Sequence, residues 1–316
     1  MDYRLLGRSG LRVSALALGT VELGLEYGIA LPGEPPRLSP DEGVRLVHAA
    51  IDAGVTLIDT ARAYGASEEV LGAALAGRRH EVVLATKVRT QAPDGATLRG
   101  EALRRVMRAS LEESLRALRT DYIDLWQIHN VDDALLAEGE AVAAAFAEAR
   151  RAGLVRAVGG STYGVKAPLA AIESGLFDVL QVTYSLLDQR LEKGVFPLAG
   201  ERGIGVVVRS VLLKGVLTAR GDYLPERLAT LRERSRAFRE LVAARGGGLS
   251  PVQAAIAFAL GHPAIGSTLV GVRSEGELRE ALGATKQPLD PRLRSELAAL
   301  RLDDPDLLNP STWGIP

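Results

Sequence analysis

The chain has 316 residues, of which 47% are hydrophobic and 24% charged, and its formal net charge at pH 7 is −1. This balance argues against a nucleic acid or a membrane surface as partner, because both favour basic patches. The chain has no cysteine, which excludes disulfides, thiol catalysis and cysteine-ligated metal centres. Its N-terminal residues lack the apolar core of a signal peptide and no apolar run reaches transmembrane length, so we expect a cytoplasmic protein.

The first half of the chain alternates predicted strands and helices. Residues 3–13 predict a small β-hairpin, and residues 15–20 a buried strand. A loop rich in glycine and proline covers 21–38, after which Ser39-Pro40-Asp41-Glu42 predicts the capped start of a helix that ends near Gly54. Further strands are expected at 56–60, 82–87 and 122–129, and helices at 67–76, 99–118 and 138–152.

The second half continues the same alternation. Strands are expected at 155–162, 179–184, 204–210 and 268–271, and helices at 167–174, 191–201, 226–244 and 250–260, with a final helix from Ser274. Eight such strand–helix units in about 260 residues match a closed (β/α)8 TIM barrel. A doubly wound sheet would place G-x-G-x-x-G after the first strand, which the chain lacks. We predict one α/β barrel domain over 1–316, with an N-terminal hairpin at 1–14 and a C-terminal tail at 303–316 over the barrel mouth.

Polar residues gather at the predicted carboxyl ends of the strands, where barrel enzymes place their active sites. They are Asp59, Lys87, His129, Ser161, Gln181 and Ser210, although Gln181 lies inside its strand. Lysine is rarely buried without a partner, and Asp59 on the adjacent strand is the natural partner of Lys87. The convergence of these groups on one rim predicts an active site.

Each of these residues also has a purely structural interpretation. Asp59 would cap the next helix, Tyr64 would be a half-buried anchor, and Lys87 would form a structural ion pair with Asp59. His129 by itself would by default be a structural histidine in the core or at the rim, with its ring nitrogens hydrogen-bonded. The 4 histidines of the chain lie on separate elements without metal-ligand spacing, so no metal site is expected.

Asp59, Tyr64, Lys87 and His129 stand in the segments LIDTARAYG, LATKV and DLWQIHN. In order and spacing they resemble the catalytic tetrad of the aldo-keto reductase superfamily. The resemblance covers nearly the whole chain and includes GRSGLRVSALALGT, SLRALRTDYIDLWQIH, VGGST, QVTYSLLDQR and GSTLVGVRSEGELREAL. It implies a barrel that binds a nicotinamide cofactor without a Rossmann domain, which accounts for the missing glycine fingerprint.

The resemblance assigns a role to each member of the tetrad. Tyr64 would be the general acid in carbonyl reduction and the general base in alcohol oxidation. The ammonium of Lys87 would lower the pKa of Tyr64 from its ordinary value of about 10, and Asp59 would hold Lys87 charged. His129 would donate a hydrogen bond to the substrate oxygen. The predicted activity is NAD(P)H-dependent interconversion of an aldehyde or ketone, sugars included, and the alcohol.

The same resemblance implies a set of cofactor contacts. Ser161 and Gln181 would hold the nicotinamide carboxamide, and Ser210 with residues 211–215 the pyrophosphate. The chain departs from the family at Thr162, where asparagine is common, and at Arg209, where many members stack an aromatic ring. The predicted contacts are Gly19, Thr20, Asp59, Ser161, Thr162, Gln181, Arg209, Ser210, Leu212, Gly215, Gly271, Arg273 and Glu277.

Two residues of opposite charge bear on the cofactor preference. Arg273 matches a position that contacts the adenosine phosphate, and a guanidinium suits the 2′-phosphate of NADP(H). Glu277 could accept a hydrogen bond from the 2′-hydroxyl of NAD(H), or form an ion pair with Arg273, Arg279 or another surface arginine. We predict NADP(H), with NAD(H) as the alternative.

Substrate specificity is expected from the loops after the strands and from the C-terminal tail. The predicted contacts with a small-molecule carbonyl or alcohol are Tyr27, Tyr64, His129 and Trp313. We expect a monomer or a small homo-oligomer. Two other functions stay open: a barrel lyase or isomerase that uses Lys87 as a Schiff-base nucleophile, and a cofactor-binding regulatory or interaction subunit with little turnover.

Overall fold

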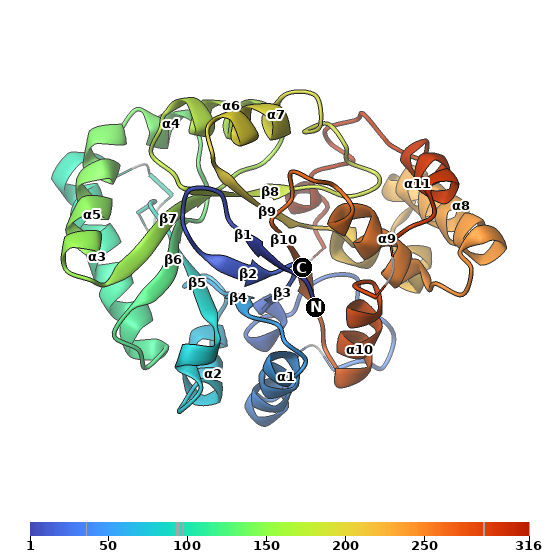
Figure 1. Ribbon diagram of the computed structural model, residues 1–316, viewed down its shortest axis with the longest axis horizontal. Helices are drawn as coiled ribbons and strands as arrows, with labels where there is room; N and C mark the ends of the chain where they lie inside the picture. Colours follow the sequence, from blue (N-terminus) through green and yellow to red (C-terminus); the bar gives the residue numbers. More distant parts are fainter. Residues whose placement is uncertain (36, 93–94, 97, 287, 316) are drawn as a thin grey trace.

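The structure is a computed structural model that describes residues 1–35, 37–92, 95–96, 98–286 and 288–315. Helices surround a closed barrel of parallel strands, and an antiparallel hairpin precedes the barrel (Figure 1). The barrel strands follow one another around the sheet in chain order, from β3 to β10. The predicted (β/α)8 fold is therefore confirmed.

The hairpin consists of two short strands, β1 (Tyr3–Leu5) and β2 (Arg12–Ser14). The barrel strands are β3 (Leu16–Gly19), β4 (Leu57–Asp59), β5 (Val83–Val88), β6 (Ile123–Ile128), β7 (Val155–Ser161), β8 (Val179–Thr183), β9 (Gly205–Arg209) and β10 (Ser267–Gly271). The helices are α1 (Pro40–Asp52), α2 (Ser67–Ala74), α3 (Gly100–Ala117), α4 (Asp133–Leu136), α5 (Gly139–Arg151), α6 (Lys166–Glu173), α7 (Val195–Glu201), α8 (Ala229–Arg245), α9 (Pro251–Leu260), α10 (Glu275–Gly283) and α11 (Pro291–Ala298).

Helix α11 is absent from the sequence predictions, in which the helix from Ser274 is the final one. Asp290 caps α11 by accepting hydrogen bonds from the backbone N–H groups of Arg292 and Leu293, and a proline follows at the first helical position. The start signal is therefore of the same kind as the one at Ser39. Only two residues of α11 are buried, so its apolar period is too short to indicate a helix by itself.

The hairpin closes the amino end of the barrel. Its side of the interior is filled by apolar residues that point inward from every strand: Ala17, Leu57, Ala85, Leu125, Ala157, Val179, Val207 and Leu269, packed against Leu6, Leu11 and Val13. Arg4 fastens the hairpin to the loop before β10, since its Nη1 donates to the backbone oxygen of Ile265 at 2.8 Å. This half of the barrel therefore has a dry, apolar interior.

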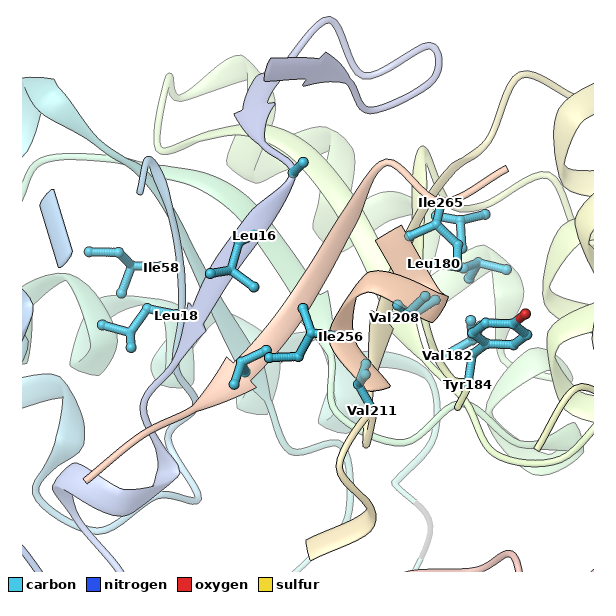
Figure 2. Packing of buried hydrophobic residues seen from close by; sticks show 14 of the residues in the cluster. Leu16, Leu18, Ile58, Leu180, Val182, Tyr184, Val208, Val211, Ile256 and Ile265 are labelled. Atoms are coloured by element: carbon cyan, nitrogen blue, oxygen red, sulfur yellow. The ribbon is translucent and has the colours of Figure 1, made fainter. Parts of the chain in front are cut away.

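The outward-facing residues of the same strands are also apolar. Leu16, Ile58, Leu180 and Val208 belong to a second cluster of buried apolar residues, separate from the one inside the barrel, and Ile256 of α9 is part of it (Figure 2). Strands buried on both faces are what a parallel sheet under helices requires. Polar side chains inside the barrel are therefore exceptions to be accounted for.

Those exceptions lie one step further along the strands. Because side chains on one face of a strand recur every second residue, Leu57 is followed inside the barrel by Asp59, Ala85 by Lys87, and Val179 by Gln181. The interior thus changes from apolar to polar toward the carboxyl end. Gln181 belongs to this polar layer although it lies within β8 and not at the end of the strand. Its side chain points into the barrel two residues after Val179, which explains why a residue inside a strand can line the site.

The C-terminal tail returns to the carboxyl end of the barrel. Lys214, which follows β9, donates from Nζ to the backbone oxygen of Ile315 at 2.6 Å, and Arg227 donates to that of Trp313. Pro316, the last residue of the predicted tail, lies outside the described residues. Among the described helices, none is long and apolar enough to cross a membrane.

Candidate active site

Lys87 is the centre of the polar layer, and its side chain is only 1% exposed. Its Nζ donates to Asp59 Oδ2, to the backbone oxygen of Thr60 at 3.0 Å and to Tyr64 Oη at 3.4 Å. An ammonium has three donors, so these acceptors account for all of them. Lys87 is thus held as a charged donor that points at the Tyr64 hydroxyl.

Asp59 is held as firmly as Lys87. Its Oδ1 accepts hydrogen bonds from Gln127 Nε2 at 3.0 Å and from Gln181 Nε2 at 2.9 Å. Thr20 Oγ1 donates to the Asp59 backbone oxygen at 2.9 Å. Sequence reasoning missed Gln127. The signal was available, because Gln127 lies midway between Leu125 and His129 on the inward face of an apolar strand.

We expect Gln127→Leu to lower the free energy of unfolding by about 2 kcal/mol, since it removes a hydrogen bond to a buried carboxylate. Denaturant titration measures this loss. Gln181→Leu serves as the matched variant. It removes a hydrogen bond to the same Asp59 oxygen, but Gln181, unlike Gln127, lines a cavity beside the tetrad. Only Gln181→Leu should also weaken cofactor binding. An equal loss of cofactor affinity in Gln127→Leu would contradict a purely supporting role.

The pKa of Tyr64 is raised above its ordinary value, because burial outweighs the lowering by Lys87. The effect of Lys87 therefore has the predicted direction, but burial, which the sequence does not reveal, is the larger effect. Burial alone lowers the pKa of Lys87, but Asp59 and Tyr64 together raise it above its ordinary value. At neutral pH Tyr64 is thus a phenol with a proton to donate, and Lys87 is an ammonium.

His129 completes the tetrad from the end of β6. Its ring lies edge-on to that of Tyr64, with 5.6 Å between centroids. Burial lowers its pKa to about 3, and Lys87, Arg209 and Arg89 contribute to the lowering. The imidazole is therefore neutral, and within the described structure its Nδ1 has no hydrogen-bond partner. A neutral imidazole can donate one hydrogen bond to a substrate oxygen without transferring a proton.

A cavity of about 490 Å³ opens beside the tetrad. Its lining includes Asp59, Tyr64 and Tyr27, and most of the predicted cofactor contacts: Gly19, Thr20, Gln181, Arg209, Ser210, Leu212, Gly215, Gly271, Arg273 and Glu277. Lys87, His129, Ser161 and Thr162 are not among the residues that line it. Trp313, predicted as a substrate contact, is packed in the hydrophobic core instead of lining the cavity. A direct contact between its ring and a substrate in this cavity is not supported.

The loop after β9 has an unusual backbone. Among the described non-glycine residues, four have positive φ, and three of them lie here: Ser210 (61°), Leu213 (48°) and Lys214 (53°). Gly215 follows at 97°. Left-handed conformations of non-glycine residues are strained and cluster at ligand sites, and alternation of backbone handedness turns successive N–H groups toward a common anion. This is the segment predicted to hold the pyrophosphate.

Arg273 and Glu277 lie together at the far end of the cavity. Glu277 Oε2 accepts from the backbone N–H of Arg273 at 2.7 Å, and its Oε1 lies 3.5 Å from Nη2 of Arg220. The guanidinium of Arg273 contacts a different carboxylate, Glu34, at 3.4 Å. Of the predicted alternatives for Glu277, the structure therefore shows an ion pair with another arginine, Arg220.

Comparison with known proteins agrees with this geometry. Residues 15–301 match the model of the Aldo/keto reductase family. The chain belongs to the aldo-keto reductases. They are oxidoreductases that generally use nicotinamide cofactors, and two features near the cavity are compatible with one: the loop after β9 has the left-handed backbone found at many ligand sites, and the buried Thr162 Oγ1 has no partner among the described residues.

Individual relatives cover most of the chain. Aldo-keto reductase YhdN of Bacillus subtilis is 31% identical over 301 residues, which are 89% of this chain and 88% of YhdN. The 6-dehydroglucose reductase of Novosphingobium aromaticivorans is 31% identical over 299 residues, 90% of each chain. Among solved structures, the holo form of aldo-keto reductase AKR11C1 from Bacillus halodurans matches with a TM-score of 0.78 at 27% identity, covering 95% of this chain and 96% of its own.

Proposed function

We propose that the protein interconverts an aldehyde or ketone and the corresponding alcohol, with NADP(H) as cofactor and Tyr64 as the acid and base. The observation that carries this proposal is the buried Lys87, held between Asp59 and the hydroxyl of Tyr64 at the wall of the cavity. A protonated tyrosine in contact with an ammonium can donate its proton readily, because the ammonium stabilises the tyrosinate that is left.

The chain's own residues handle the proton and the substrate oxygen. A bound nicotinamide cofactor would supply or accept the hydride. In reduction, Tyr64 donates its hydroxyl proton to the carbonyl oxygen, and Lys87 stabilises the tyrosinate left behind. His129 donates a hydrogen bond to the same oxygen. In oxidation the tyrosinate removes the proton from the alcohol, so Lys87 must remain charged in both directions.

The remaining predicted contacts would bind the cofactor along the cavity. Gln181 and Ser161 would face the nicotinamide, and the strained loop from Ser210 would hold the pyrophosphate. Arg209 would lie beside the nicotinamide. Its guanidinium lies 4.0 Å from the centroid of the Tyr163 ring and donates to the backbone oxygen of Thr162 at 3.1 Å, which keeps its plane fixed.

The contacts of Lys87 argue against the Schiff-base alternative. A lysine nucleophile must be neutral, whereas Asp59 and Tyr64 raise the pKa of Lys87 and occupy its donors. The regulatory-subunit alternative makes a different prediction, namely cofactor binding without turnover. A single set of activity measurements distinguishes both alternatives from the reductase.

The test is to follow NADPH and NADH consumption with a panel of aldehydes, ketones and aldoses. The name of the relative 6-dehydroglucose reductase supports placing carbonyl sugars first in this panel. Turnover of any carbonyl supports the proposal. Cofactor binding without turnover across the panel would favour the regulatory subunit, and covalent trapping of a substrate on Lys87 by borohydride would favour the lyase.

We expect wild type to prefer NADPH over NADH, and Arg273→Ala to lower kcat/KM with NADPH by about tenfold, because a guanidinium–phosphate contact is lost. NADH use should be unchanged. Glu277→Gln, in the first turn of α10, is the matched variant. If wild type prefers NADH and Glu277→Gln shifts that preference toward NADPH, the cofactor assignment is wrong.

A further inference from the structure

Glu34 contacts Arg220 and Arg273, two arginines that line the cavity. It belongs to the loop between β3 and α1, far in sequence from both arginines. Arg220 donates to both Glu34 oxygens, from Nη1 at 2.5 Å and from Nη2 at 2.8 Å. Arg273 Nη1 lies 3.4 Å from Glu34 Oε2. One carboxylate therefore bridges two guanidinium groups that line the cavity.

Both arginines are shielded, with side chains 18% and 17% exposed. Hydrogen bonds from Arg220 are the main cause that lowers the pKa of Glu34 below its ordinary value, so Glu34 is ionised at neutral pH. A forked contact between a guanidinium and a carboxylate has the same geometry as one with a phosphate. Glu34 thus occupies a position in which an anionic ligand would bind.

Two other carboxyl groups lie near these arginines: Glu277 contacts both, and Glu22 is within electrostatic range of Arg273. Glu277 contacts Arg220 at 3.5 Å and the backbone of Arg273. Glu22 is 8% exposed and packs over Gly271, where an added Cβ would lie 2.0 Å from its Oε1. Adding a phosphate of charge near −2 to this group while Glu34 remains in place would set like charges against one another.

The loop that carries Glu34 is held in place by contacts other than those of the Glu34 side chain. Its backbone is tied to the loop after β9, because Ile29 donates from its backbone N to the Lys214 oxygen at 3.0 Å and accepts from Arg220 Nη1 at 3.0 Å. These contacts do not involve the Glu34 side chain. Replacing that carboxylate by an amide should therefore leave the loop in place.

We propose that the Glu34 carboxylate competes with the 2′-phosphate of NADP(H) for Arg220 and Arg273, and so sets the preference between NADP(H) and NAD(H). This inference rests on the proposed nicotinamide cofactor. On binding, the phosphate replaces the carboxylate as the shared partner of the two guanidinium groups, and Glu34 turns toward solvent. NAD(H) has a neutral hydroxyl at this position, so Glu34 keeps its place when NAD(H) binds.

The experiment is calorimetric titration of the full chain with NADP+, NAD+, 2′,5′-ADP and 5′-AMP. Glu34→Gln is the test variant, because it removes the charge and keeps the shape. Glu34→Asp keeps the charge, and Glu26→Gln removes a charge from an exposed position of the same loop. We expect Glu34→Gln to tighten NADP+ and 2′,5′-ADP by about tenfold and to leave NAD+ and 5′-AMP within about twofold. Both other variants should stay close to wild type.

Two results would overturn the inference. If Glu34→Gln lowers the affinity for NADP+ and for NAD+ alike, Glu34 holds the loop in place for binding of either cofactor and does not compete with the phosphate. If the ratio of the two affinities does not change, Glu34 has no part in the preference. Because binding is measured without a carbonyl substrate, a selective change supports the inference even if the panel shows no turnover. Conversely, turnover with an unchanged affinity ratio leaves the reductase in place and removes only this inference.

Discussion

Tyr64→Phe is expected to reduce the rate of carbonyl reduction by about a thousandfold, which is the usual contribution of a positioned general acid. The variant keeps the ring against His129 and loses only the hydroxyl that contacts Lys87 at 3.4 Å. The loss should therefore appear in kcat, while the Kd for the cofactor stays near that of wild type. Steady-state kinetics and calorimetric cofactor titration measure the two quantities separately.

The matched control is Tyr163→Phe. Tyr163 lies on the same rim, its ring stacks on Arg209, and 39% of it is exposed. Removal of its hydroxyl should leave turnover nearly unchanged. Wild-type-like turnover in Tyr64→Phe would end the proposed mechanism, and equal losses in the two variants would show that the rim tolerates no change of polarity.

Lys87→Met is expected to lower turnover strongly and to shift the pH dependence of the activity that remains. Lys87 lowers the pKa of Tyr64, while burial and Asp59 raise it. Without the ammonium the raising effects remain alone, so the tyrosinate needed for alcohol oxidation forms only at higher pH. The rising, acid-side limb of the pH–rate profile for oxidation should therefore move to higher pH. Rates at a series of pH values, measured in the direction of oxidation, test this shift in whatever activity is left.

The same substitution carries a cost in stability. It leaves Asp59, 4% exposed, without its cation, and breaking a buried ion pair in this way typically costs about 3–5 kcal/mol. Lys87→Met with Asp59→Asn is the matched double variant, since it removes both charges and should recover much of that loss without recovering turnover. Retained activity with an unchanged pH profile in Lys87→Met would reduce Lys87 to a structural role.

The order of strands and helices, and hence the barrel, follows from local patterns in the amino-acid sequence. Strands such as β5 and β6 are buried on both faces and mostly apolar, and capped starts at Ser39 and Ser250 signal helices between strands. Local rules suffice here because strand period and helix caps act within a few residues. The convergence of Asp59, Lys87 and His129 was predicted for the same reason: a lysine or an aspartate at the end of an apolar strand needs a partner, and parallel strands bring their ends to one rim. The tetrad as a set, with Tyr64 in it, was predicted from the family resemblance.

How these groups act on one another depends on the three-dimensional packing of the whole chain. The burial that raises the pKa of Tyr64 depends on every element around it, so the net direction could not be read from the neighbouring lysine alone. The bridge from Glu34 to Arg220 and Arg273 joins residues separated by 186 and 239 positions. No local pattern predicts such a contact, because a loop's course over the barrel is set by the packing of distant elements.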